Sequence, residues 1–233
     1  FEAILPTVAI SIGNKKGKCL LVSTPKEKNW FYEYYTDNSP NYISIKYTSY
    51  EGGLYTKEFL EDVRRKTPEV IFNNEYMAEF MDGGSGLFEY KDKLTTTDDI
   101  TNKIGLSAGV DWGMENDYTV LTIINKQGQL CYIKRWRKMD WDIMMAEIVR
   151  ILHEHGSPLC YAETNGIGNM PYKTLKKLYG KTREWTTTEK NKKEAILKLA
   201  EDIKTGKLQL PNVPYLIDEL DNFTFTFDNG KLK

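Results

Sequence analysis

Two acidic residues stand at the ends of short apolar segments. Asp111 follows the segment 106–110 and Glu163 follows 159–162, and a glycine-containing turn comes directly after each acid. A carboxylate at the end of a buried strand is costly unless it is paired or bound to a metal. Carboxylate oxygens suit Mg²⁺ or Mn²⁺, and two such ions about 4 Å apart can activate water and stabilise the leaving oxygen of a phosphodiester. We therefore predict that Asp111 and Glu163 are catalytic metal ligands.

A plainer interpretation is open for each acid taken alone. Asp111 could be a turn residue and Glu163 a hydrogen-bonded strand end, so the pair becomes informative only where the fold brings the two together. Asp117 and Asn165 lie close to the two acids along the chain. We interpret both as candidates for outer positions around a metal. A role in the turn and direct binding of the metal as a third ligand are the alternatives for Asp117.

The elements around these acids predict a mixed α/β domain from about residue 106. Apolar and β-branched runs predict strands at 106–112, 118–124, 129–136, 159–163 and 183–185. Apolar residues at helical spacing predict helices over 140–156, 171–180 and 189–204. Three strands followed by alternating helices and strands is the element order of the ribonuclease H-like fold, in which the first and fourth strands are neighbours. Asp111 and Glu163 would then face each other across one edge of the sheet.

The first part of the chain is too small for a complete α/β domain. Its sequence predicts strands at 18–23 and 42–47 and helices at 56–66 and 68–79. Residues 91–105 are polar and without periodicity, a composition typical of a linker. No Gly-x-x-x-x-Gly-Lys-Ser/Thr loop occurs in the chain, so we do not expect it to hold a nucleotide in a P-loop by itself.

Composition narrows the class of protein. Of the 233 residues 40% are hydrophobic and 28% are charged, which is a globular composition. No apolar run approaches the roughly 20 residues that cross a bilayer, and the start of the chain has no basic segment typical of a secretion signal. Three scattered cysteines predict buried reduced thiols and a cytoplasmic setting.

Basic residues are unevenly spread although the net charge is only −1. Residues 171–210 hold eleven Lys and Arg against five Asp and Glu, and the patch 134–138 has a tryptophan between its cations. We interpret these segments as candidate contacts for a polyanion. Ordinary solvated helix surface is the alternative. The candidate residues are Lys134, Arg135, Arg137, Lys190, Lys192 and Lys193.

Two motifs in the second part resemble the nuclease domain of tailed-phage large terminase subunits. They are Val110-Asp111-Trp112-Gly113 with Asp117-Tyr118-Thr119, and the run from Tyr161 to Gly168. In the first part, Leu20 to Pro25 resembles the Ser-Thr-Pro coupling segment of the packaging ATPase in this family. The run 72–80 with 86–88 resembles the segment that leads from ATPase to nuclease. No single motif is strongly specific, but together they cover nearly the whole chain in the family's order.

This resemblance implies an ATPase remnant with linker over 1–105 and a ribonuclease H-like nuclease domain over 106–233, without its last helix. By position, Asp111 and Glu163 are similar to the family's first two metal-binding acids, and Ser23 and Thr24 to its ATP-hydrolysis relay. The family's third acid lies in a later His-Asp-Asp-like stretch, which has no match here. The chain instead ends in a predicted β-hairpin around residues 229–230.

The resemblance also implies a function. The domain would cut concatemeric double-stranded DNA endonucleolytically with a two-ion Mg²⁺ or Mn²⁺ site, in the host cytoplasm. Its partners would be the portal protein and the small terminase subunit, with no membrane. The six basic residues would contact DNA phosphates, which carry no sequence information. ATPase activity is not expected, because the Walker segments are absent, and the missing third acid puts the activity of this chain in doubt.

Three alternatives remain open from the sequence. A Holliday-junction resolvase or transposase-like nuclease would keep the fold, although such enzymes have no ATPase remnant upstream. An actin-like nucleotide-binding half also begins with three strands, and the segment 166–168 is a weak candidate for its phosphate loop. A non-catalytic module that docks on DNA or on the portal would need no complete metal site.

Overall fold

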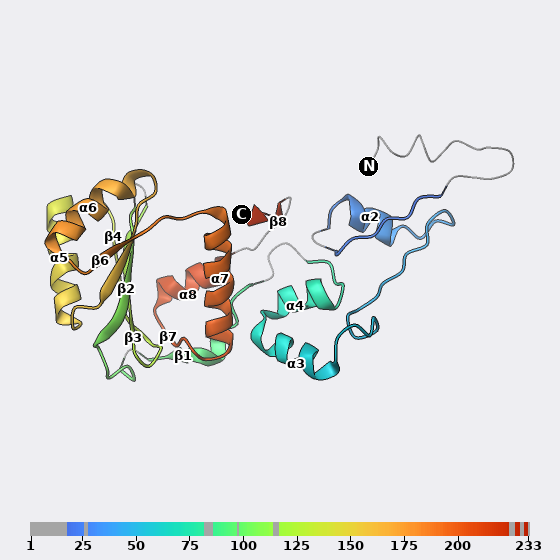
Figure 1. Ribbon diagram of the computed structural model, residues 1–233, viewed down its shortest axis with the longest axis horizontal. Helices are drawn as coiled ribbons and strands as arrows, with labels where there is room; N and C mark the ends of the chain where they lie inside the picture. Colours follow the sequence, from blue (N-terminus) through green and yellow to red (C-terminus); the bar gives the residue numbers. More distant parts are fainter. Residues whose placement is uncertain are drawn as a thin grey trace.

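A five-stranded mixed sheet organises the second part of the molecule. The computed structural model describes residues 18–25, 28–81, 86–96, 98–113, 117–223, 227–228 and 231–232. The sheet has the order β4-β3-β2-β5-β6, antiparallel from β2 to β4 and parallel from β2 to β6 (Figure 1). Its strands are β2 (Gly105–Asp111), β3 (Thr119–Asn125), β4 (Leu130–Trp136), β5 (Leu159–Glu163) and β6 (Thr182–Trp185). The predicted mixed sheet is confirmed, and so is the pairing of the first strand with the fourth.

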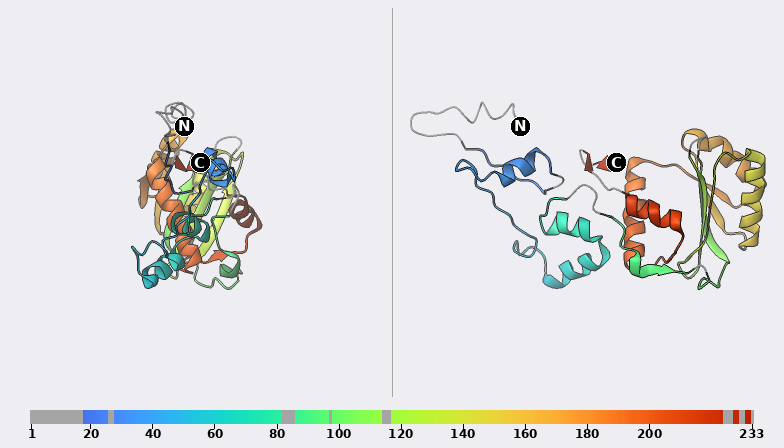
Figure 2. Two further views of the ribbon diagram at one scale, coloured as in Figure 1. Left: turned by 90° about the vertical axis from the view of Figure 1, so that its right-hand side faces the viewer. Right: turned by 180° about the vertical axis from the view of Figure 1, so that it is seen from behind.

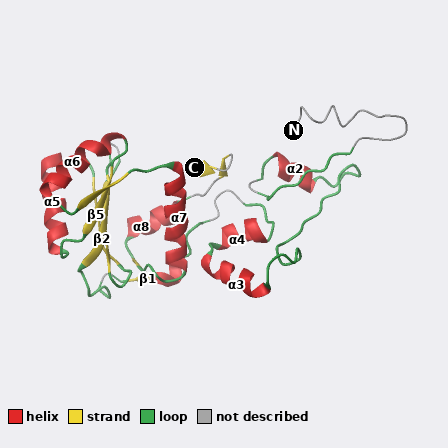
Figure 3. Cartoon of the chain, viewed as in Figure 1, coloured by secondary structure: helices red, strands yellow, loops and turns green. Residues whose placement is uncertain are grey.

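Helices α5 (Trp141–Glu154) and α6 (Asn169–Leu178) cover one face of this sheet (Figure 3). Asp140 caps α5 as predicted, because its carboxylate accepts hydrogen bonds from the backbone N–H groups of Asp142 and Ile143. The helix buries one apolar stripe against the strands. The stripe consists of Met144, Met145, Ile148, Ile151 and Leu152. Burial of each such side chain contributes roughly 1.5–3 kcal/mol to folding. These five residues belong to a larger apolar cluster with side chains of the strands.

The opposite face carries α7 (Glu189–Lys204) and α8 (Pro214–Asn222), as the view from behind in Figure 2 shows. Here β7 (Leu210–Pro211) pairs in parallel with β1 (Leu94–Thr95), which follows the short 3-10 helix η1 (Lys91–Lys93). A second apolar cluster fills the space between these elements and the sheet. It contains Tyr90, Leu130, Ile203, Leu208, Leu210 and Leu220. The stretch 91–105, expected as a polar linker, therefore contains near its start a strand that pairs with the second part. Neither α8 nor the β1–β7 pair was predicted from the sequence.

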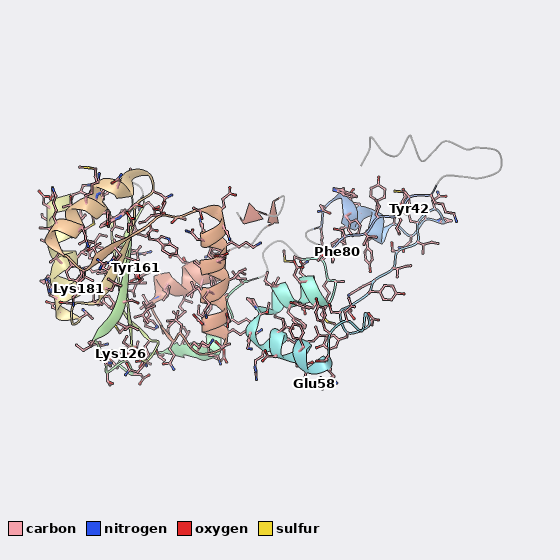
Figure 4. All side chains as sticks on the ribbon, in the orientation of Figure 1. Tyr42, Glu58, Phe80, Lys126, Tyr161 and Lys181 are labelled. Atoms are coloured by element: carbon pink, nitrogen blue, oxygen red, sulfur yellow. The ribbon has the colours of Figure 1, made fainter. Side chains whose placement is uncertain are left out.

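Within the described residues, the first part holds the helices α2 (Trp30–Thr36), α3 (Lys57–Lys66) and α4 (Glu69–Tyr76). The last two confirm the predicted helices. Phe80 packs against α2, with its ring centroid 4.9 Å from that of Tyr32, and Figure 4 labels Phe80 next to this helix. The predicted strands at 18–23 and 42–47 are wrong. Neither segment pairs with another strand among the residues described, and a strand needs such a neighbour for its backbone hydrogen bonds.

The end of the chain forms the predicted hairpin, with β8 (Phe227–Asp228) antiparallel to β9 (Lys231–Leu232). The predicted turn at residues 229–230 lies outside the described residues. Cys131 and Cys160 are buried free thiols as predicted, but Cys19 is exposed, because no strand forms around it. None of the helices within the described ranges is long and apolar enough to cross a membrane.

Candidate metal centre

The parallel pairing of β2 and β5 brings Asp111 and Glu163 together. Val110 lies opposite Ala162 in the register, so the two acids come next, at the carboxyl ends of adjacent strands. Their carboxyl groups lie close enough to affect each other, and a proton on one of them would let the pair form a hydrogen bond, because two ionised carboxylates only accept. This juxtaposition is the one that the strand order predicted from the sequence.

The surroundings of Asp111 favour its protonated form. The protein around the carboxyl group keeps water away and raises its pKa to about 6, and hydrogen bonding with Glu163 and the negative charge of that residue act in the same direction. A hydrogen bond from the backbone N–H of Trp112 opposes this shift. Asp111 is nevertheless open to solvent on one side, and Glu163 is half-buried. Two carboxyl groups that hold one proton at an accessible edge are a ligand pair for a divalent cation, which would displace that proton.

Trp112 fixes the two strand ends to each other. Its indole Nε1–H donates to the backbone carbonyl of Glu163 at 3.0 Å, and only 7% of the residue is exposed. Its ring also lies 6.0 Å from that of Trp141, at the start of α5. The tryptophan was visible in the motif, but this positioning role was not predicted, because its partners lie 29 and 51 residues further along the chain.

Two glycines allow the turns after the acids to close tightly. A Cβ atom at Gly113 would lie 2.3 Å from the carbonyl carbon of Tyr118. A Cβ atom at Gly168, which ends the 3-10 helix η2 (Gly166–Gly168), would lie 2.5 Å from the carbonyl oxygen of Glu163. Neither position has room for a side chain, so both turns keep their backbones close to the ends of β2 and β5.

The two predicted outer residues take different positions. The negative charge of Asp117 adds to the rise in the pKa of Asp111, and its carboxylate accepts from the N–H of Tyr118 at 2.8 Å. The side-chain amide of Asn165 donates to the carbonyl of Thr187 at 2.8 Å and accepts from the N–H of that residue at 2.6 Å. Asn165 therefore orients the loop after Glu163. Within the described part of the chain, no group of three His, Cys, Asp or Glu residues is arranged to hold a metal ion.

The basic residues of β4 are largely engaged inside the molecule. Lys134 pairs with Glu147 on α5. Arg135 lies between two rings, 4.3 Å from the centroid of Tyr118 and 4.1 Å from that of Tyr215, and 3.5 Å from the carboxylate of Glu219. These contacts join β4 to α5 and α8. Lys134 and Arg135 are therefore not simply solvated surface residues.

The other predicted basic residues lie nearer the loops of the site. Arg137 is exposed, with its guanidinium 5.4 Å from the ring centroid of Tyr118. Lys190 and Lys192 are exposed in the first turn of α7, and Lys193 next to them is half-buried. This turn directly follows Thr187, to which Asn165 binds, so it starts beside the loop that follows Glu163.

The segment 18–25, which contains Ser23 and Thr24, lies in the first part of the molecule, away from β2 and β5 (Figure 1). Both are exposed, and the hydroxyl of Ser23 donates to the carbonyl of Thr24 at 3.0 Å. The next residue, Pro25, is buried, and its carbonyl accepts a hydrogen bond from the side chain of Asn74 on α4. The structure therefore does not bring the predicted relay residues to the candidate metal centre.

We expect Asp111→Asn to stabilise the protein at neutral pH. The pKa of Asp111 in the folded protein is about 6, above the ordinary value of 3.8. Its protonated form therefore favours the folded protein at low pH, and this contribution to the free energy of unfolding is lost as pH rises through 6. The amide keeps a hydrogen bond to Glu163 without the second charge. Allowing for solvent screening, we expect a gain of about 1 kcal/mol, or about 3 °C in Tm, near pH 7.5.

This prediction is checked by thermal unfolding of both proteins in EDTA at about pH 7.5 and about pH 4. The difference in Tm should vanish at the lower pH, where Asp111 is protonated in the folded protein. Asp99→Asn is the matched control, because hydrogen bonds from Thr96 lower the pKa of Asp99, so removal of that charge should not stabilise. If Asp111→Asn unfolded at or below the wild-type temperature at neutral pH, this would contradict a raised pKa of Asp111 in the folded protein.

Comparison with protein families identifies both parts of the sequence. Residues 108–229 match the family described as terminase RNaseH-like domain. Residues 2–94 match the family described as terminase large subunit, T4likevirus-type, N-terminal. The first match covers more than half of the chain, and the second is not expected of a resolvase or an actin-like protein.

Curated relatives agree with these families. The terminase large subunit of Thermus phage G20c is 24% identical over 96% of this chain and 52% of the relative. That of Escherichia phage T5 is 27% identical over 48% of this chain and 29% of the relative. The chain thus spans about half the length of the first of these relatives.

Solved structures share the fold at low identity. The large terminase of another thermophilic bacteriophage superposes with a TM-score of 0.64 and 11% identity, over 90% of this chain and 55% of that one. The large terminase nuclease of phage G20c with bound magnesium gives a TM-score of 0.50 and 22% identity, over 55% and 68%. The chain belongs to the terminase large subunit family and carries its RNaseH-like domain.

Proposed function

We propose that the second part of this chain is the metal-dependent endonuclease of a DNA-packaging terminase and that it cuts concatemeric double-stranded DNA. The observation that carries this proposal is the position of Asp111 and Glu163 at the ends of adjacent parallel strands, where burial and the proximity of Glu163 raise the pKa of Asp111. A protein gains no stability from two acids that must share a proton. Such a pair is typical of a site that holds a cation during catalysis.

The donor set of the pair fits a magnesium or manganese ion. Magnesium is commonly held by one or two carboxylates, with substrate phosphates and water as the remaining ligands. Crystal structures of the phage G20c nuclease carry magnesium in one case and cobalt in another. Asp111 and Glu163 would hold the cation, and when bound the metal centre supplies an activated water and stabilises the leaving oxygen. A second ion would need a further carboxylate beyond this pair.

Other residues of the chain prepare the site. Trp112 holds the ends of β2 and β5 at a fixed separation through its bond to the carbonyl of Glu163. Asn165 fixes the following loop against Thr187, so the carboxylates need little rearrangement on binding. Asp117 adds negative charge at the edge of the site and strengthens its attraction for a cation.

Phosphate contacts would come from cations around the site. Arg137 and the first turn of α7, with Lys190, Lys192 and Lys193, are the candidates near its loops. Lys134 and Arg135 would contribute mainly through the field of their charges, because internal partners already hold them. We also propose the portal protein and the small terminase subunit as partners, and the host cytoplasm as the place of action.

Metal-dependent nicking of supercoiled plasmid tests the proposed function. This chain and the full-length product of its gene are each incubated with plasmid in Mg²⁺, in Mn²⁺ and in EDTA. We expect nicking by the full-length product with either metal and none in EDTA, because hydrolysis requires the cation. Full-length protein that binds DNA but never nicks it with either metal would refute the nuclease assignment and favour a docking module.

A further inference from the structure

A hollow of about 760 Å³ opens beside the carboxylate pair. Gly113 and Asp117 from the turn after β2 form part of its wall, and Ile167 and Met170 from the segment after β5 form another part. These are the two chain segments that directly follow Asp111 and Glu163. A strand of DNA held at the carboxylates would therefore pass the mouth of this hollow.

The floor and the rim of the hollow differ in character. The floor is made of side chains that are almost fully buried, namely Trp136, Met144 and Met145. At the rim the indole of Trp141 is 42% exposed and Met170 is 71% exposed. The indole ring is flat and the thioethers are polarisable, and both kinds of group favour contact with an aromatic ring. The volume is within the range of pockets that hold small ligands.

Among the described residues that line the hollow, the charged ones are exposed and stand at the rim. Arg137 and Lys138 lie where β4 leads into α5, and Lys138 adopts a φ of 54°, which is uncommon for a lysine. Asp117 and Asp142 stand elsewhere around the opening. The cations suit a phosphate on either side of an inserted group, and the acids can accept hydrogen bonds from the amino groups of a base.

We propose that this hollow takes one unstacked nucleobase from the DNA strand that lies across the carboxylate pair. The inference rests on the proposed function, because only a nuclease substrate would bring DNA to this edge. An apolar, aromatic-lined hollow with cations at its mouth matches a nucleotide, which has a flat ring and a phosphate. An apolar side chain from a partner protein would use the floor but would leave Arg137 and Lys138 without an anion.

Trp141 couples the hollow to the metal site. Its ring contacts Trp112, which is bound to the carbonyl of Glu163 and follows Asp111 in sequence. A base that stacks on Trp141 therefore rests against the group that spaces the two acids. Removing a base from the duplex stack costs a few kcal/mol, so the hollow favours positions where a base is already unpaired.

Binding of three duplexes tests this proposal. One is fully paired, one carries a single bulged adenine, and the third carries an abasic residue at the same bulge. Affinities are measured by fluorescence anisotropy with the Asp111→Asn form of this chain, which cannot cut. We expect the base-bulged duplex to bind about tenfold more tightly than the abasic one, since stacking contributes about 1–3 kcal/mol per base.

Variants locate the base in the hollow. Trp141→Ala and Met170→Ala should each bring the ratio between the bulged and abasic duplexes close to one. Ile143→Ala is the matched control, because this residue is 61% exposed two positions further along α5 and does not line the hollow. It should leave the ratio unchanged.

The outcomes separate this inference from the proposed function. Equal affinity for the bulged and abasic duplexes would overturn the base site and leave the hollow to a protein side chain, without affecting the nuclease. A preference for the base that survives in both Trp141→Ala and Met170→Ala would also overturn it, because the base would then lie elsewhere. Failure to bind any duplex would remove the inference together with the DNA-binding part of the proposed function.

Discussion

In the Asp111→Asn and Glu163→Gln variants, Mn²⁺-dependent nicking of supercoiled plasmid is expected to fall by about a thousandfold or more. Such a loss corresponds to about 4 kcal/mol of transition-state stabilisation. The reason is that each substitution removes one of the two anionic ligands that the ends of β2 and β5 bring together. The measurement is the initial rate of nicking by the full-length product of the gene.

Unfolding of the Asp111→Asn variant would not account for its loss of activity. Asp111→Asn should be more stable than the wild type at neutral pH, because the variant no longer holds two negative charges close together. Asp117→Asn should reduce the rate by about 10- to 100-fold, as expected for a residue that supports the metal ligands without binding the metal itself. Asp218→Asn, on the exposed surface of α8, should nick at the wild-type rate. Full activity of Asp111→Asn or of Glu163→Gln would show that the metal binds elsewhere.

The sequence predicted the parts of this site that depend on local patterns. Strands β2 and β5 are short, mostly apolar runs, and α5 carries a regular apolar stripe after its cap Asp140. Once the order of elements is known, the neighbourhood of β2 and β5 follows, and with it the contact between Asp111 and Glu163. The prediction succeeded because a parallel pair places both strand ends at the same edge.

Features that depend on distant partners could not be predicted in this way. Lys134 and Arg135 look like a free basic patch in sequence, but their partners Glu147, Tyr215 and Glu219 come from two other helices. The same limit applies to the β1–β7 pair, whose two strands lie more than a hundred residues apart. The hollow was missed because Met144 and Met145 belong to the apolar stripe of α5, which predicts core.

The predicted strands of the first part failed for a related reason. Residues 18–23 and 42–47 have strand-like composition, but their apolar side chains, such as Val22 and Ile43, are 84% and 90% exposed. Composition expresses a preference for a pleated, half-buried surface, and it cannot supply the neighbouring strand. Asn74, whose side chain reaches the carbonyl of Pro25, is the buried contact that holds this segment to α4.

Gly168→Ala is expected to lower both the stability and the activity of the protein. The φ of Gly168 is −62°, a value open to any residue, so the constraint on this position is space rather than conformation. An added methyl group would lie 2.5 Å from the carbonyl oxygen of Glu163 and 3.1 Å from Cδ1 of Trp112. Overpacking of this kind costs about 1–3 kcal/mol. Relief of the clash requires the end of β5 to move, and a shift of about 1 Å near a reacting centre can reduce the rate about a hundredfold.

Gly180→Ala separates this crowding from the general effect of losing a glycine. Gly180 lies just after α6, and an added Cβ there would meet no atom within 4 Å. We expect Gly180→Ala to stay within about 0.5 kcal/mol of the wild type and to nick at the same rate. The checks are urea unfolding and plasmid nicking of both variants. If Gly168→Ala retained wild-type activity and stability, the carbonyl of Glu163 would not be held against this loop, and the position of the second acid would depend on Trp112 alone.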